Sequence, residues 1–285
     1  AYLETHDAGG NTVTLGDPTS MGDGIANNDS VLTLRISGVT SLNVNNQSIA
    51  DLTGIQDFIS LDMLYCSDNQ LTTLDVSQNT SLTYLSCSEN QLTTLDVSNN
   101  LLLDQIHCNN NNLLTTVIFS ENSYSISSLD LRNNLIDSIA LPLNSSSIGE
   151  FIISDNNLNN LDLRNINFVD FRCDNNQLSS LDLRNGYNTD IVIIKALGNP
   201  NLTCISVDDT AYSNTNWTGS NFQFDNHTSF SNNCDAKTYV PDDNFEAYLE
   251  THDASGNTVT LGDPTSMGDG TANSDSVLTA NISAV

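Results

Sequence analysis

The sequence predicts a mainly β fold in which successive turns of chain stack into a solenoid with parallel β-sheet walls. A skeleton of the form L-x-x-L-x-C-x-x-N-x-L, followed by x-x-L-D-V-S-x-N, recurs at spacings of 20 to 23 residues. Its L-x-C step has the two-residue period of a strand that buries one face. Because one such coil buries too little apolar surface by itself, a repeat of this length predicts stacking. The coils begin at Leu61, Leu82, Leu103, Ile126, Ile148, Phe168 and Ile191, after a degenerate copy at 39–49.

Each element of the coil has an expected place. Leu64 and Cys66 point inward and Tyr65 points outward, since strand side chains alternate. The asparagine three residues after the Cys position turns the chain, and its amide is expected to bond the backbone of its own and the neighbouring coil. The half with the L-D-V-S-x-N pattern repeats this logic on the opposite wall. The asparagines are Asn69, Asn90, Asn111, Asn134, Asn156, Asn176 and Asn199.

The repeat resembles the leucine-rich repeats of bacterial proteins, and its nested halves look like the IRREKO class with 21-residue units. The resemblance covers about residues 39–202, and the flanks resemble the caps of secreted Bacteroidetes surface proteins. It implies a leucine-rich repeat solenoid, an extracellular location and a binding or adhesion role without catalysis. The chain departs from the pattern at 112–125 and at 139–147, where Pro142 interrupts the opposite wall.

A second repeat divides the chain into domains. Residues 1–39 and 247–285 match at 33 of 39 positions at an offset of 246, which indicates tandem units in a longer protein. We expect an N-terminal cap at 1–38 with a short helix, a solenoid of about eight coils at 39–202, a C-terminal cap at 203–234 and, at 235–285, a linker and the cap of a following copy. In PDDNFEAYLETHD, Asp242 or Asp243 caps a helix with an apolar stripe of Phe245, Tyr248 and Leu249. The segment 241–285 is also expected to permit domain-swapped self-association.

The six cysteines separate into two groups. Cys66, Cys87, Cys108 and Cys173 occupy one column of the repeat, where apolar residues substitute in other coils, so we interpret them as small buried hydrophobes. A stacked thiolate metal site lacks the tetrahedral convergence that zinc requires. Cys204 and Cys234 bracket the stretch that holds the only tryptophan, Trp217, and predict a disulfide that closes the C-terminal cap in an oxidising compartment.

The net charge of the chain limits which classes of molecule it can bind. The formal net charge is −28, from 7 Lys plus Arg against 35 Asp plus Glu. Such a surface repels phosphate backbones and anionic lipid, so we expect no nucleic-acid partner. We also expect no transmembrane segment, because no run of the sequence approaches 18 apolar residues. The acidic segments near each end suggest at most a calcium site, because hard cations bind several oxygens of a flexible loop. A polar loop with Asx turns is the competing interpretation. The candidate ligands are Asp17, Asp23 and Asp29, with Asp263, Asp269 and Asp275 in the copy.

The outward positions of the regular wall form the candidate binding site. Tyr65 and Tyr84 are expected to be exposed aromatics on which a sugar or a peptide could stack. Charged residues follow in the later coils, where cross-strand ion pairing on a solvated sheet competes with ligand binding as the interpretation. The candidate wall residues are Tyr65, Tyr84, His107, Asp130, Arg132, Glu150, Asp170 and Arg172.

No enzyme class fits the pattern. Glu150 and Asp170 fall at equivalent positions of neighbouring coils, near the spacing of glycosidase carboxylates, but a flat wall offers no cleft that excludes water. The sequence therefore predicts a non-enzymatic extracellular module that binds protein or polysaccharide, with no cofactor beyond a possible calcium ion. A structural spacer or targeting array within a larger surface protein is the alternative.

Overall fold

The computed structural model describes residues 2–25, 31–120, 126–142, 147–234, 237–239, 243–263, 265–268 and 276–278. The chain is mainly β, a parallel solenoid of about eight turns with few helices, as the sequence predicts. It divides into two compact units. Unit 1 comprises 1–157 and 165–173, and unit 2 comprises 158–164 and 174–285.

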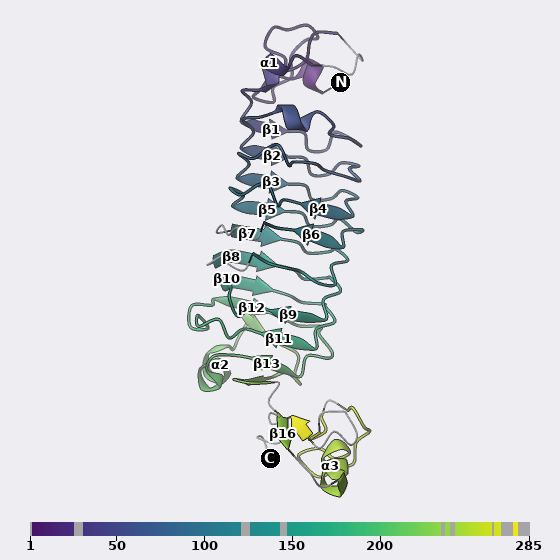
Figure 1. Ribbon diagram of the computed structural model, residues 1–285, viewed down its shortest axis with the longest axis vertical. Coiled ribbons are helices and arrows are strands. Elements are labelled where there is room, and N and C mark those ends of the chain that lie inside the picture. Colours follow the sequence, from purple (N-terminus) through teal and green to yellow (C-terminus); the bar gives the residue numbers. More distant parts are fainter. Residues whose placement is uncertain are drawn as a thin grey trace. The chain divides into compact units, whose positions relative to one another are not determined.

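Short strands dominate unit 1 (Figure 1). One wall carries β1 (Ser41–Asn43), β2 (Met63–Tyr65), β3 (Tyr84–Ser86), β5 (Gln105–His107), β7 (Ile126–Asp130), β8 (Ser147–Ile152) and β10 (Asn167–Arg172). The opposite wall carries β4 (Thr94–Asp96) and β6 (Thr116–Ile118), and the helical turns are η1 (Leu3–Thr5), α1 (Thr33–Ile36) and η2 (Ile55–Asp57). These strands pair in parallel, and equivalent residues of successive coils stand in register, such as Leu64 with Leu85 and Leu85 with Ile106.

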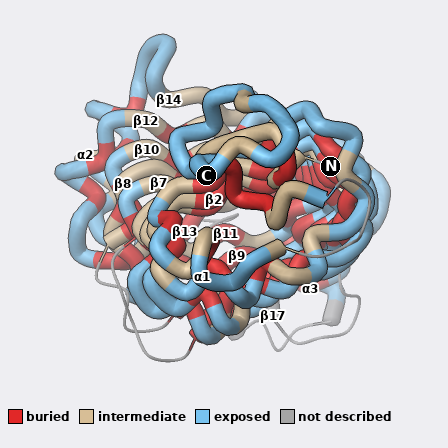
Figure 2. Tube along the Cα trace, turned by 90° about the horizontal axis from the view of Figure 1, so that it is seen from above, coloured by how far each residue is buried: buried red, intermediate tan, exposed pale blue. Residues whose placement is uncertain are grey.

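The leucine positions make the core. Leu64, Leu85 and Ile106 have no exposed surface, and buried positions recur between exposed ones along the coils (Figure 2). Cys66, Cys87 and Cys108 continue this interior row as free, buried thiols, as the sequence predicts. Burial raises the pKa of Cys66 well above its ordinary value, and a hydrogen bond with Cys108 followed by burial does the same for Cys87. Both residues therefore stay protonated and act as small hydrophobes.

A ladder of asparagines joins the coils. The Asn90 amide donates to the carbonyl oxygens of Cys87 at 3.1 Å and of Cys66, one coil earlier, at 3.0 Å. Its Oδ1 accepts from the backbone N–H of Leu71 at 3.0 Å. Asn69, Asn111, Asn134 and Asn156 make equivalent bonds to their own and the preceding coil. These amides pair backbone groups that the turn would otherwise leave buried and unpaired.

The turn before each asparagine needs a left-handed backbone. Asp68, Asn110 and Asn133 have φ values of 56°, 58° and 55°, and Glu89 has 54°. Short polar side chains tolerate this region better than glutamate does. We expect Glu89→Asn to raise the free energy of unfolding by about 0.5–1 kcal/mol and the melting temperature by about 2 °C. Thermal unfolding followed by circular dichroism measures this, and Asp68→Asn is the control with no comparable gain.

Unit 2 contains the later coils and residues 203–234, which the sequence predicts to be a C-terminal cap. Its parallel four-stranded sheet has the order β15 (Ser229–Ser231), β13 (Cys204–Ser206), β11 (Ser180–Asp182) and β9 (Asn160–Asp162), and β12 (Ile193–Lys195) pairs with β14 (Phe222–Gln223). Helix α2 (Thr210–Asn216) is capped by Asp209, which accepts from Tyr212 N–H at 3.0 Å. Trp217 is buried against Phe222 and Phe230. These aromatic side chains supply an apolar layer after the last coil.

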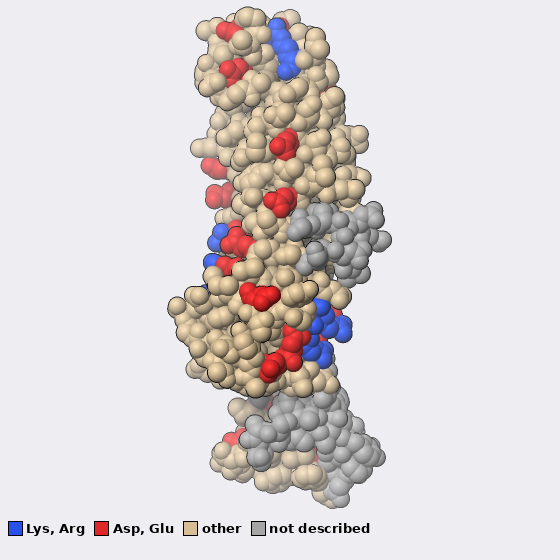
Figure 3. Space-filling model, turned by 90° about the vertical axis from the view of Figure 1, so that its left-hand side faces the viewer, with Lys and Arg blue, Asp and Glu red and all other residues tan. Residues whose placement is uncertain are grey.

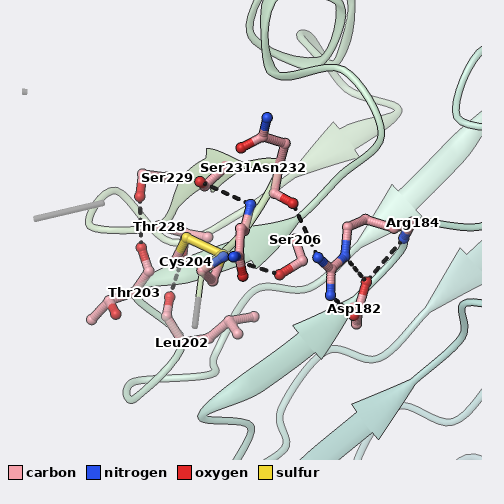
Figure 4. The surroundings of a disulfide bond; sticks show 12 residues. Asp182, Arg184, Leu202, Thr203, Cys204, Ser206, Thr228, Ser229, Ser231 and Asn232 are labelled. Atoms are coloured by element: carbon pink, nitrogen blue, oxygen red, sulfur yellow. Dashed lines mark hydrogen bonds and ion pairs between the residues drawn. A yellow bond between two sulfur atoms is a disulfide. The ribbon is translucent and has the colours of Figure 1, made fainter. Parts of the chain in front are cut away.

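The predicted disulfide is confirmed. Cys204 and Cys234 are bonded, with 5.8 Å between their Cα atoms. Around them, Cys234 N–H donates to Ser206 Oγ at 3.4 Å, and Arg184 donates to the carbonyl of Asn232 at 3.1 Å while it pairs with Asp182 (Figure 4). The bond and the arginine therefore tie the last strands of the cap to the repeat sheet.

The described parts of the near-identical terminal segments share local contacts. Tyr2 stacks on His6 with ring centroids 3.7 Å apart, and Tyr248 stacks on His252 at 3.9 Å. The later segment also holds α3 (Asp243–Glu250), β16 (Lys237–Tyr239) and β17 (Ser276–Leu278), the two strands antiparallel. The expected apolar stripe of α3 is wrong in part, because Leu249 is buried whereas Phe245 and Tyr248 are exposed. None of the helices in the described ranges combines the length and apolar character that crossing a bilayer requires.

Candidate functional site

The candidate site is the outward face of β2, β3, β5, β7, β8 and β10, which we call the outer wall of unit 1. The strand register arranges its side chains in two columns. One column contains Met63, Tyr84, Gln105, Ser128, Glu150 and Asp170. The other contains Tyr65, Ser86, His107, Asp130, Ile152 and Arg172. The structure thus brings the predicted wall residues onto one face of one unit.

An aromatic cluster occupies the first three of these strands. The Tyr65 and Tyr84 ring centroids are 4.8 Å apart, and His107 meets Tyr84 edge-on at 5.5 Å. Tyr65 and Tyr84 were expected to be exposed, but both are half-buried because their rings shield one another. The cluster therefore presents a continuous aromatic surface instead of separate rings, and sequence periodicity alone gave no signal for this contact.

A polar chain continues from the cluster across the next two strands. Ser128 Oγ lies 3.4 Å from His107 Nε2 and donates to Glu150 Oε2 at 3.1 Å. In register with Glu150, Asp170 instead accepts from Arg172, with Nε to Oδ1 at 2.9 Å and the terminal nitrogen to Oδ2 at 2.6 Å. The two carboxylates considered for catalysis thus have different partners on this open wall.

The ion pairs described on this wall run along the strands. Cross-strand pairing was one of two interpretations of the sequence, and the structure pairs Arg132 with Asp130 and Arg172 with Asp170, two residues apart along the chain. Side chains two apart on a strand share a face, and arginine is long enough to fold back over the shorter aspartate. On the opposite wall of unit 2, Arg164 does reach across coils, to Asp182 at 3.5 Å, as well as pairing with Asp162.

Two positions expected on the solvent side are buried. Asp130 is 6% exposed and Ile152 is 4% exposed. Arg132 folds over Asp130 and donates to it through Nε and its terminal nitrogen. Ile152 stands in register between Asp130 and Arg172. Asp130 therefore acts as an anchor for Arg132, and the accessible atoms at this position belong to the arginine.

A glycine fixes the close approach of β7 and β8 beside Glu150. A Cβ atom on Gly149 would lie 2.6 Å from the carbonyl oxygen of Ser127. We expect Gly149→Ala to lower the free energy of unfolding by about 1–3 kcal/mol, because β8 must shift away from β7. Urea unfolding measures the loss. Gly38→Ala is the control, since nothing lies within 4 Å of its Cβ position, and an equal loss there would contradict the steric explanation.

The acidic loops show their own hydrogen bonds. Asp17 Oδ1 accepts hydrogen bonds from the hydroxyl and the N–H of Thr19 at 2.6 and 2.8 Å. Asp263 Oδ1 accepts the same two bonds from Thr265 at the same distances. These bonds lower the pKa of both aspartates. Asp23 Oδ1 accepts from Ile25 N–H at 2.9 Å in the same turn geometry.

The calcium hypothesis stays a prediction. Asp29, Asp269 and Asp275 lie outside the described residues. Within the described ranges, no group of three or more His, Cys, Asp or Glu side chains is arranged to hold a metal ion.

The chain resembles listerial proteins over part of its length. No family model matches it. Internalin J of Listeria monocytogenes serotype 4b is 46% identical over 52 residues, which is 18% of this chain and 6% of that protein. Among solved structures, the functional domain of InlJ from Listeria monocytogenes, which includes a cysteine ladder, is 21% identical, with 62% of this chain and 61% of that one covered and a TM-score of 0.23. Internalin C2 from the same species is 20% identical, with 58% and 84% covered and a TM-score of 0.37.

Proposed function

We propose that this chain is a non-enzymatic extracellular recognition or adhesion module and that the outer wall of unit 1 binds a protein or a glycan. The observation that carries the proposal is the aromatic cluster of Tyr65, Tyr84 and His107 on the outward face of three successive strands. Half-buried, mutually packed aromatic side chains lose little conformational entropy on binding and are enriched at the centres of interfaces.

The extracellular location rests on a separate observation. The Cys204–Cys234 disulfide is of the kind that persists in oxidising compartments. The IRREKO class of the repeats and the resemblance of the flanks to Bacteroidetes-type surface proteins remain part of this proposal. An open wall whose acidic groups are engaged with Ser128 and Arg172 favours recognition over catalysis.

A structural spacer is the second candidate. The terminal segments match at 33 of 39 positions, and their described parts share the same stacked rings and turns. Tandem copies of this kind suit an array that holds another domain at a distance. In that case the outer wall would need no ligand.

Aromatic substitutions separate the two candidates. We expect Tyr65→Ala and Tyr84→Ala to weaken binding to whichever glycan or protein the wild type recognises on arrays by about tenfold or more, because interface aromatics often contribute more than 1.4 kcal/mol. Tyr187→Ala is the matched control, since Tyr187 is an exposed tyrosine of unit 2. Absence of wild-type binding to every array would favour the spacer, whereas equal affinity of all variants would mean that binding does not use the aromatic cluster.

A further inference from the structure

The Lys and Arg side chains that the structure describes already form hydrogen bonds or ion pairs within the chain. On the outer wall, Arg132 and Arg172 pair with Asp130 and Asp170. Arg35 donates to the carbonyl of Gly22 at 2.6 Å, and Lys195 donates to the carbonyl of Ser220. Arg164 and Arg184 pair with Asp162 and Asp182. Each Lys and Arg side chain that the structure describes therefore already donates to an acceptor within the chain, and four of the arginines are paired with an aspartate.

Carboxylates, by contrast, remain available around the aromatic cluster. Glu150 belongs to no ion pair in the described part of the chain, and its Oε2 accepts only a neutral hydroxyl bond from Ser128. Asp68 and Glu89 are exposed in the turns that follow β2 and β3. Figure 3 shows the same imbalance on one face, where the few blue Lys and Arg atoms over the strands lie mostly against red Asp or Glu atoms.

An aromatic cluster with carboxylates on the same wall is a surface that can bind a positively charged side chain. A lysine or arginine side chain can lay its apolar stem and its charge over a tyrosine face, a contact that strengthens as it becomes desolvated. A carboxylate nearby adds a charge-assisted hydrogen bond. The net charge of −28 would steer such a partner toward this chain at low ionic strength.

We propose that the ligand of the outer wall is a basic polypeptide segment that places one Lys or Arg over Tyr65 and Tyr84 and a second at Glu150. This inference rests on the proposed function and specifies its partner. Glu150 stands three strands beyond Tyr84, through β5, β7 and β8, which corresponds to about 14 Å at the usual strand spacing. An extended peptide advances about 3.3 Å per residue, so the two basic residues lie about four positions apart.

Binding of a synthetic probe tests this partner chemistry. The probe is a serine-rich peptide with two lysines about four positions apart, compared with the same peptide carrying glutamates and with maltohexaose as a neutral glycan. Of the three probes, we expect only the lysine peptide to bind the full chain. The affinity of the chain for this peptide should fall about fivefold to tenfold in Glu150→Gln and in Tyr84→Leu. Both variants retain a wall side chain of similar size, which protects the fold. Asp96→Asn, on the opposite wall of unit 1, removes the same charge and is expected to change the affinity less than twofold.

The outcomes separate the partner chemistry from the recognition role. Equal weakening in Glu150→Gln and Asp96→Asn would mean that long-range charge alone attracts the peptide, and it would overturn the proposed contact. If the wild type binds maltohexaose and this binding weakens in Tyr84→Leu but not in Glu150→Gln, the ligand is not a basic polypeptide. The outer wall would then still be a recognition surface. Failure of the lysine peptide to bind the wild type would also overturn the basic partner, whereas the array experiment decides the recognition role.

Discussion

Replacing Asn90 with alanine is expected to lower the free energy of unfolding by about 3–5 kcal/mol, and the equivalent asparagines of the other coils should behave alike. Its amide donates to three carbonyl oxygens, those of Cys66, Cys87 and Ser88, and its Oδ1 accepts from Leu71 N–H. Asn90 is buried, so these backbone groups lose their partner without gaining water. Urea unfolding followed by circular dichroism measures the change.

The neighbouring residue supplies the control for this prediction. Gln91 is exposed, and its backbone N–H donates to Leu71 O whichever side chain it carries. Gln91→Ala is therefore expected to change the free energy of unfolding by less than about 0.5 kcal/mol. An Asn90→Ala chain as stable as the Gln91→Ala chain would show that the asparagine ladder does not hold the coils together.

Loss of the disulfide is the second large effect. The Cys204→Ser, Cys234→Ser double variant is expected to unfold with a free energy lower by about 2–4 kcal/mol, since the bond closes a loop with a sequence separation of 30. Weaker protection of unit 2 should accompany the loss, because Ser206, Arg184 and Asn232 are arranged around the bond. Hydrogen exchange read by mass spectrometry locates the change, and urea unfolding gives its size.

Reduction of the wild type provides a matched comparison for the disulfide. Dithiothreitol should reproduce the effect of the double variant and leave the double variant itself unchanged, because the remaining cysteines are free and buried. Increased exchange in β2 and β3 of unit 1 instead of in β13 and β15 would contradict a local role for the bond.

The coil could be predicted from sequence because its rules are local and repeated. A leucine and a cysteine two positions apart share the buried face, and an asparagine three positions later meets the same carbonyl groups in every coil. Each repeat is an independent instance of the same pattern, so the register of Leu64, Leu85 and Ile106 follows without any three-dimensional information. The disulfide followed because Cys204 and Cys234 lie outside this pattern.

The surface was predicted less well because it depends on contacts between side chains. The alternation of side chains along a strand predicts the direction of Asp130, but it does not predict that Arg132 folds over this residue and buries it. The alternation also does not predict whether an arginine pairs with an aspartate on the next strand or with one two residues away on its own strand. The length of the arginine side chain decides this. The approach of Tyr84 to His107 depends on rotamers, and these follow from packing.

The helix near the C-terminal end of the chain shows the limit of amphipathic patterns. A stripe of Phe245, Tyr248 and Leu249 was expected, yet Leu249 is buried together with Glu246 and Glu250. A Cβ atom on Gly268 would lie 2.1 Å from the Glu250 carboxyl, so the chain packs closely over that acid. Glu4 and Gly22 have the same relation in the first copy, where Glu4 accepts from the N–H groups of Asp23 and Gly24. A buried acid that binds backbone N–H groups is invisible to a hydrophobic periodicity.

Hydroxyl-radical footprinting tests most directly whether the outer wall of unit 1 is the binding surface, because it reads the aromatic side chains themselves. With the ligand that the arrays or the lysine peptide identify, we predict that oxidation of Tyr65, Tyr84 and His107 falls on binding while that of Tyr187 is unchanged. Protection of Tyr187, with the three wall residues oxidised as fast as in the free chain, would contradict the account.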